Sequence, residues 1–237
     1  MTALSERLRV RYFGREHPYR ALESLLAASL PANAVLLDAG CGRTAPLLEK
    51  QVGKAQRLIG VDIGDIFPSV PGIEVITADL GNIPLEDASV DLAVSRSVME
   101  HLAAPETVYA EVHRLLRPGG QFIFLTPNLW DYASLISLAV PDSLHPYIVS
   151  RTEGRSEADV FPTYYRSNSR RKVHRLARGA GFEVGSFQYL GQYPNYFMFN
   201  GALFLAATAY EKLISKVRTL NILQGWILVS LRKPRMK

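Results

Sequence analysis

The stretch AVLLDAGCGRT, residues 34–44, decides the fold of this 237-residue chain. A short apolar run ends in a carboxylate, Asp38, and the glycines Gly40 and Gly42 follow it closely. Apolar runs of this length that end at glycine are typical of buried strands. Glycine also lets the backbone adopt unusual dihedral angles and lets a ligand approach it closely. The stretch therefore predicts a strand that runs into a ligand-binding turn.

Four further apolar runs follow, and three of them end close to Asp62, Asp79 and Ser95. Helical or short crossover segments separate the runs, and this alternation predicts a parallel sheet with helices on both faces. Ligands of such sheets bind outside the carboxyl ends of the strands. We therefore expect Asp38, Asp62, Asp79 and Ser95 to converge on one cleft. The five expected strands cover residues 34–40, 57–64, 73–80, 90–97 and 121–128.

Helices are expected before, within and after this alternating region. Apolar spacing predicts a helix over residues 19–30 and another over 105–120, the latter ended by Pro118 and two glycines. Beyond Asn128 the alternation breaks. A helix is expected from residue 168 and a last strand near the end of the chain.

The overall composition restricts the functional classes. The net charge of +5 is too small to indicate a nucleic-acid partner, and none is expected. The single cysteine, Cys41, excludes an internal disulfide and indicates a reducing compartment. The first residues lack the apolar core of a secretory signal, and no apolar run is long enough for a membrane span. We therefore expect a cytoplasmic protein.

Asp38 and Asp62 distinguish between two cofactors. Asp62 ends the second strand, where a carboxylate can accept hydrogen bonds from ribose hydroxyls. Gly40, Gly42 and Ala45 also match a loose dinucleotide fingerprint, so an NAD-dependent oxidoreductase is one alternative. A carboxylate at Asp38 would repel a pyrophosphate, however, and would attract an ammonium group. S-adenosylmethionine carries both a ribose and an ammonium group, which favours it over NAD.

Several motifs together resemble class I S-adenosylmethionine-dependent methyltransferases, most closely the small-molecule and quinone-type branch. They are VLLDAGCGRT, IGVDIG, ITADLGNIPLEDASVDLAVS, MEHL and LRPGGQFIFLTPN, in that order, between residues 35 and 128. The resemblance implies a Rossmann-like α/β sandwich with a mostly parallel seven-stranded sheet, a helical N-terminal extension and inserted helices after strand 5. It implies one domain, with the extension at 1–32, the cofactor-binding core at 33–128, and acceptor-side insertions with the C-terminal strands at 129–237.

The resemblance also assigns cofactor-binding residues. It places Asp38, Gly40 and Gly42 at the methionine part of S-adenosylmethionine and Asp62 at the ribose, with Ile63 as a further contact. It places Asp79 at the adenine amino group, the Leu80 backbone at the adenine ring and Ser95 beside the methionine end. No metal is expected.

The catalytic candidates are His101, His145, Tyr165 and Arg166. The two histidines could serve as bases, and Tyr165 and Arg166 could orient an anionic or carbonyl oxygen. Structural roles are the alternative. For the segment FPTYYRSNS, 161–169, the alternative is a helix N-cap made by Ser167 or Asn168, with packing by the tyrosines.

The segment 196–216 begins with an aromatic-rich run and continues into an expected helix. This helix would interrupt the antiparallel hairpin that closes related folds. Three interpretations remain open: a helix buried in a homodimer or core, the wall of a pocket for an apolar acceptor, and a peripheral membrane contact.

The resemblance implies transfer of a methyl group to an oxygen, nitrogen or carbon atom of a small-molecule or lipid-like acceptor. A protein that binds S-adenosylmethionine without transferring its methyl group is a further alternative. The acceptor contacts would lie in the variable segments, and the sequence therefore does not identify the acceptor.

Overall fold

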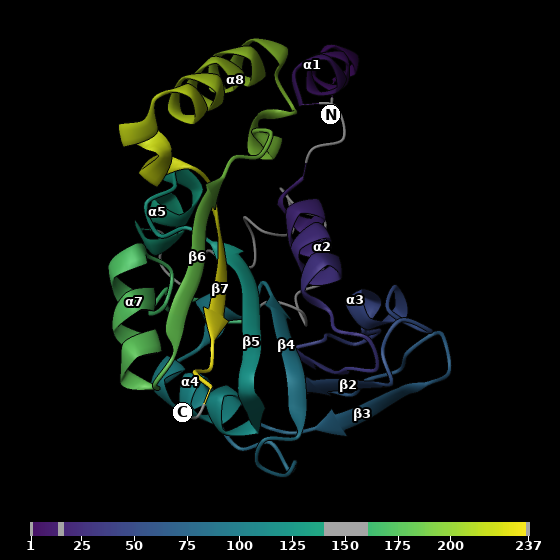
Figure 1. The fold of residues 1–237 in the computed structure, drawn as a ribbon. Coiled ribbons are helices and arrows are strands. Elements are labelled where there is room, and N and C mark those ends of the chain that lie inside the picture. Colours follow the sequence, from purple (N-terminus) through teal and green to yellow (C-terminus); the bar gives the residue numbers. More distant parts are fainter. Residues whose placement is uncertain (1, 14–16, 140–160, 236–237) are drawn as a thin grey trace. The chain divides into compact units, whose positions relative to one another are not determined.

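The computed structural model describes residues 2–13, 17–139 and 161–235. It contains a seven-stranded sheet with the order β3-β2-β1-β4-β5-β7-β6 (Figure 1). Strands β1 to β5 pair in parallel. The sheet is mixed, because β7 runs opposite to its neighbours β5 and β6. The fold is thus the expected mostly parallel, Rossmann-like one. The strands are β1 (Val35–Ala39), β2 (Arg57–Asp62), β3 (Ile73–Thr77), β4 (Val90–Arg96), β5 (Leu116–Pro127), β6 (Glu183–Leu190) and β7 (Trp226–Arg232).

The helices include the expected N-terminal helical extension, which consists of two helices, and the expected insertions after β5. Helices α1 and α2 precede β1, α5 follows β5, and α8 separates β6 from β7. The α-helices are α1 (Ala3–Phe13), α2 (Pro18–Ser29), α3 (Pro46–Glu49), α4 (Pro105–Leu115), α5 (Tyr132–Ala139), α7 (Arg170–Gly179) and α8 (Gly201–Lys216). The short 3-10 helices are η1 (Met99–His101), η4 (Asn195–Phe197) and η5 (Arg218–Leu223).

The residues group into two compact units, each of which is described by itself. The single-domain organisation stays a prediction. The first unit comprises Met1–Arg20, Pro127–Thr163 and Tyr189–Ile227. The second comprises Ala21–Thr126, Tyr164–Gln188 and Leu228–Lys237, and it contains all of the proposed cofactor residues.

The core of the second unit is formed by the sheet and α4. Every residue of β1 is buried, as is typical of a parallel strand covered on both faces. Tyr109 of α4 meets Phe122 and Phe124 of β5 edge-on, with ring centroids 6.1 and 6.0 Å apart. These contacts hold α4 against β5, and the apolar spacing of α4 correctly predicts this buried face.

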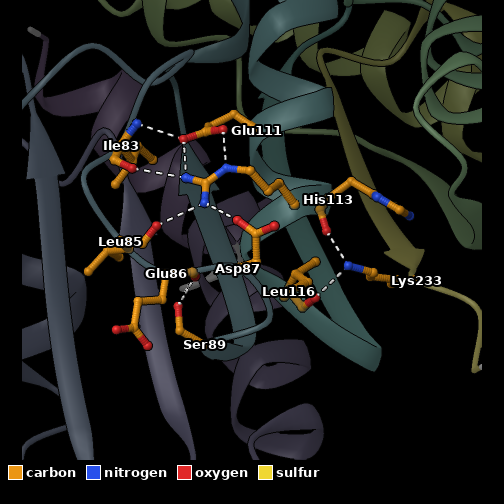
Figure 2. A network of polar contacts seen from close by, with 10 residues as sticks. Ile83, Leu85, Glu86, Asp87, Ser89, Glu111, His113, Leu116 and Lys233 are labelled. Atoms are coloured by element: carbon orange, nitrogen blue, oxygen red, sulfur yellow. Dashed lines mark hydrogen bonds and ion pairs between the residues drawn. The ribbon is translucent and has the colours of Figure 1, made fainter.

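The C-terminal end of α4 differs from the prediction. The helix ends at Leu115, and Pro118 lies inside β5 and does not mark the end of the helix. The reason is strand pairing, because Leu116 is already in register with Val90 of β4. Lys233 Nζ donates to the carbonyl oxygens of His113 and Leu116 at 2.7 and 2.8 Å, so it satisfies acceptors that the helix end leaves open (Figure 2).

A polar network fastens the connection between β3 and β4 to α4. The Arg114 guanidinium donates to the Glu111 carboxylate and to the carbonyl oxygens of Ile83 and Leu85. It also pairs with Asp87. Glu111 in turn accepts from the Ile83 amide at 2.7 Å (Figure 2). The chain that follows Asp79 is therefore anchored by one arginine and one buried carboxylate.

None of the helices within the described residues has both the length and the apolar character that crossing a bilayer requires. The cytoplasmic location stays a prediction.

Candidate cofactor site

The candidate site lies at the carboxyl ends of β1, β2 and β4. Strands β2 and β4 flank β1 on its two sides, so the chain order reverses at β1, and such points bind ligands in open α/β sheets. The Ser95 hydroxyl donates to the Ala39 carbonyl at 2.7 Å. The Asp62 carboxylate accepts from the Gly42 amide at 2.8 Å. The structure thus brings Ser95, Gly42 and Asp62 to the end of the strand that carries Asp38.

Asp38 is the electrostatic centre of this site. Its side chain is only 2% exposed, and its Oδ1 atom has no hydrogen-bond partner. Burial raises the pKa of Asp38 to about 7, with Arg96 acting against the shift and Asp62 adding to it. A buried carboxylate is costly unless it is paired. The ammonium group of an amino acid supplies the missing charge and hydrogen bond, so the site fits the methionine part of S-adenosylmethionine.

The two glycines of the turn have different structural roles. Gly40 has a φ of +84°, and a Cβ atom there would lie 2.3 Å from Cγ2 of Val98. Gly42 has a φ of +69°, but a Cβ atom there would meet nothing within 4 Å. Gly40 therefore lets the turn pack against the chain after β4, whereas Gly42 borders open space. Open space beside a backbone amide is what close approach of a ligand requires.

The residues assigned to the nucleoside follow β2 and β3. The Ala78 amide donates to the Asp62 carbonyl at 3.0 Å, so the chain after β3 lies beside the end of β2. Asp79 is exposed, and its Oδ1 accepts from the Gly81 amide at 2.6 Å. Leu80 is buried, whereas the side chain of Ile63 is 58% exposed. The cofactor contacts of these residues remain proposals.

A buried network, which the sequence analysis did not single out, lies beside the end of β4. Glu100 is 5% exposed, and its carboxylate accepts from the Thr126 hydroxyl at 2.8 Å. The Glu100 carbonyl accepts from the amides of Tyr164 and Tyr165 at 2.8 and 3.1 Å. Glu100 therefore joins the segment around residue 165 to the ends of β4 and β5. The only sequence feature that marks Glu100 is its position in the MEHL motif, and in that motif His101 was the predicted functional residue.

Three of the four catalytic candidates lie close to this network. His101 Nε2 is 3.8 Å from a Glu100 carboxylate oxygen. Tyr165 is 6% exposed with a φ of +49°, and the Arg166 guanidinium donates to the Ala103 carbonyl and stacks on Tyr164. The structure brings His101, Tyr165 and Arg166 to one loop cluster, and their chemical roles stay predictions. His145 lies outside the described residues.

The alternative interpretation of residues 161–169 as a helix N-cap was wrong in its details. Ser169 occupies the N-cap position of α7, and it makes no side-chain capping bond. The Ser167 hydroxyl donates to the Met99 carbonyl at 3.0 Å, and the Asn168 amide donates to the Thr126 hydroxyl at 2.7 Å. Both side chains are engaged by residues distant in sequence, which local spacing cannot reveal.

The cysteine between the glycines is structural. Cys41 is a buried free thiol, and burial together with the charges of Asp38 and Asp62 raises its pKa. Such a thiol is a poor nucleophile. Among the described residues, no three histidine, cysteine or acidic side chains gather as metal ligands.

The fold and the site together define a class of protein: a Rossmann-like domain with a buried carboxylate, one oxygen of which has no partner, at the carboxyl end of its central strand. Comparison with known proteins agrees, since residues 37–124 match the family described as "Methyltransferase domain". The matched region carries most of the motifs that resemble class I S-adenosylmethionine-dependent methyltransferases, so the comparison supports the class that the sequence predicts.

Individual relatives are consistent with this assignment. A Mycolicibacterium smegmatis protein named "Probable S-adenosylmethionine-dependent methyltransferase/" is 37% identical over 156 residues, which are 63% of this chain and 52% of that protein. The rice 24-methylenesterol C-methyltransferase 2 is 27% identical over 63% of this chain and 41% of its own length. The chain spans about half the length of the curated relatives it matches.

Solved structures share the fold at low sequence identity. The Burkholderia thailandensis 1,6-didemethyltoxoflavin-N1-methyltransferase, solved with bound 1,6-didemethyltoxoflavin and S-adenosylhomocysteine, has a TM-score of 0.57 and 17% identity. The match covers 98% of this chain and 87% of that one. At this identity, the likeness supports the fold alone.

Proposed function

We propose that this protein transfers the methyl group of S-adenosylmethionine to an oxygen, nitrogen or carbon atom of a small or lipid-like acceptor. The match of residues 37–124 to the methyltransferase family model supports the reaction class. The observation that carries the cofactor assignment is the buried Asp38 carboxylate with its unpartnered Oδ1 atom. A pyrophosphate cofactor would place more negative charge beside it, whereas S-adenosylmethionine brings an ammonium group.

The residues of the site have distinct proposed roles. Asp38 pairs with the ammonium group, and Asp62 accepts from the ribose hydroxyls while its other hydrogen bond to Gly42 fixes the turn. Asp79 and the Leu80 backbone bind the adenine, Ile63 contacts the nucleoside, and Ser95 lies beside the methionine end. S-adenosylmethionine, when bound, supplies a methyl group that its positively charged sulfur has already activated.

Because the methyl donor is activated, positioning of the acceptor can supply most of the rate enhancement. We propose that the loop cluster of His101, Tyr165 and Arg166 orients the acceptor. A base is needed only where the acceptor atom carries a proton that it must lose. The side chain of His101 is 29% exposed, so it can exchange that proton with solvent.

A lipid-like acceptor is supported by the character of the first unit. Its α8 and the residues before it expose large apolar side chains, among them Phe199 at 65% and Leu213 at 55%. The rice relative, by its name, methylates a sterol at carbon. Small-molecule acceptors belong to the proposal as well, because the sequence motifs resemble those of the small-molecule and quinone-type branch.

The test is methyl transfer from radiolabelled S-adenosylmethionine to a panel of acceptors that contains sterols, quinols, amines and phenols. We expect label to appear in at least one class, together with stoichiometric S-adenosylhomocysteine. His101→Ala should lower the turnover of a protonated acceptor more than that of a deprotonated one. Binding of S-adenosylmethionine without label transfer to any class would favour the alternative of a non-catalytic binding protein.

A further inference from the structure

Helices α1 and α8 of the first unit lie side by side (Figure 1). Phe13 of α1 forms one buried cluster with Met198 and with Phe204 of α8. The Thr2 amide donates to the Met198 carbonyl at 3.0 Å, and Lys212 Nζ lies 4.7 Å from the centroid of the Phe13 ring. The two helices thus bury their facing side chains against each other. Their opposite faces are exposed to solvent.

The outward face of α8 is apolar. The buried residues of this helix recur every three or four positions, at Phe204, Thr208, Glu211 and Ile214. The opposite face carries no charge until the last turn of the helix. Leu205 and Leu213 are 47% and 55% exposed on it. The exposed residues on this face are Ala202, Leu205, Ala206, Ala209, Leu213 and Lys216.

The outward face of α1 adds both apolar and basic groups. Leu4 and Val10 are 56% and 57% exposed. Arg7 and Arg11 are exposed beside them, one helical turn apart. A helix that exposes leucine or valine next to arginine is suited to the boundary between lipid headgroups and acyl chains. We call the exposed residues of α1 and α8, together with Phe199, the α1–α8 surface.

The exposed charges among the described residues of this unit are mostly positive. Among its described residues, Arg7, Arg11, Arg20, Lys216 and Arg218 are exposed cations. The described acidic residues are fewer. Asp131 and Glu211 are each only 4% exposed, and Glu6, whose side chain is 41% exposed, is paired with Arg9 at 2.5 Å.

We infer that the α1–α8 surface docks the protein onto an anionic lipid membrane. The apolar side chains would enter the headgroup boundary, and the cations would pair with lipid phosphates. A second copy of the chain is a poorer occupant, because it would bring identical basic residues against this surface. The inference does not depend on methyl transfer, so its failure would leave the proposed function untouched.

The test is sedimentation of the 237-residue chain with two kinds of vesicle. One kind is phosphatidylcholine alone, and the other is an equimolar mixture of phosphatidylcholine and phosphatidylglycerol. We expect binding to the anionic vesicles, weaker binding to the neutral ones, and loss of binding at high salt. Each exposed arginine should contribute about fivefold to the partition coefficient, so replacing Arg7 and Arg11 by glutamine should lower it about 25-fold.

A matched pair of variants isolates the apolar contribution. Leu205→Asp lies on the α1–α8 surface, and Val52→Asp places the same change at a similarly exposed site, 43%, in the second unit. We expect Leu205→Asp to reduce vesicle binding about tenfold and Val52→Asp to leave it unchanged. Thermal melting and S-adenosylhomocysteine binding of each variant show that the fold and the cofactor site are intact.

Three results would overturn the inference. The first is no partition onto anionic vesicles, and the second is equal partition onto both kinds of vesicle at all salt concentrations. The third is a dimer in sedimentation velocity that Leu205→Asp dissociates, which would assign the surface to a second copy of the chain.

Discussion

At the scale of single residues, Asp38 has three properties that local sequence does not predict. Its position after an apolar run is visible in the sequence, but its burial, its unpartnered oxygen and the proximity of Asp62 and Arg96 are tertiary features. Burial holds the pKa of its carboxyl at about 7, which places the charge of the site within reach of ordinary changes in pH.

We predict that the affinity for S-adenosylhomocysteine rises with pH up to about 7. Below its pKa of about 7, Asp38 is protonated and neutral, and an ammonium ligand must first displace that proton. Affinity should therefore fall about tenfold for each pH unit below the pKa and level off above it. Asp38→Asn should bind about 10- to 100-fold more weakly at neutral pH and lose this dependence.

Calorimetric titrations at several pH values provide the measurement. Glu86→Gln, which changes an exposed carboxylate between β3 and β4, is the control and should behave like the wild type. Two results would contradict a cofactor-binding role for Asp38. One is a wild-type affinity that does not change with pH, and the other is an Asp38→Asn affinity equal to that of the wild type.

At the scale of helices and strands, the sequence predicted the alternating part of the fold well. Strands β1 to β5 carry compact apolar runs, and α4 and α7 bury the faces that their spacing indicates. The errors came from contacts between distant segments. Pairing of Leu116 with Val90 starts β5 early, and the buried partners of Ser167 and Asn168 draw these side chains away from capping.

The contact between α4 and the β3–β4 connection predicts that Glu111 stabilises the fold. Hydrogen bonds from Arg114 lower the pKa of Glu111, although partial burial acts in the opposite direction. A carboxyl whose pKa is lower in the folded state stabilises the fold above its unfolded-state pKa of about 4.3. This stabilisation is lost as the pH falls through the folded-state pKa.

Glu111→Gln should therefore lower the free energy of unfolding by about 1 to 3 kcal/mol at neutral pH. The difference from the wild type should shrink below about pH 4, where the wild-type carboxyl becomes protonated. Urea unfolding at both pH values measures it. Glu106→Gln, an exposed change in the first turn of α4, is the matched control. Equal stabilities of the two variants at neutral pH would contradict the role of the network shown in Figure 2.

At the scale of the whole molecule, the two compact units divide the proposed tasks. The second unit holds every proposed cofactor residue and the loop cluster of His101, while the first unit carries the α1–α8 surface. Sequence motifs identified the second unit because they reflect one cofactor. The first unit has no such motif. The excess of exposed cations among its described residues depends on the burial of Asp131 and Glu211, which only the structure shows.

The central claim is that the acidic edge of the sheet selects a nucleoside that carries an ammonium group over a dinucleotide. The direct measurement is isothermal titration of the wild type with S-adenosylhomocysteine and, separately, with NAD. We predict saturable binding of S-adenosylhomocysteine, no measurable heat with NAD, and at least about tenfold weaker S-adenosylhomocysteine binding in Asp62→Ala, which loses the ribose acceptor. Absence of S-adenosylhomocysteine binding, or NAD binding of equal strength, would contradict the claim.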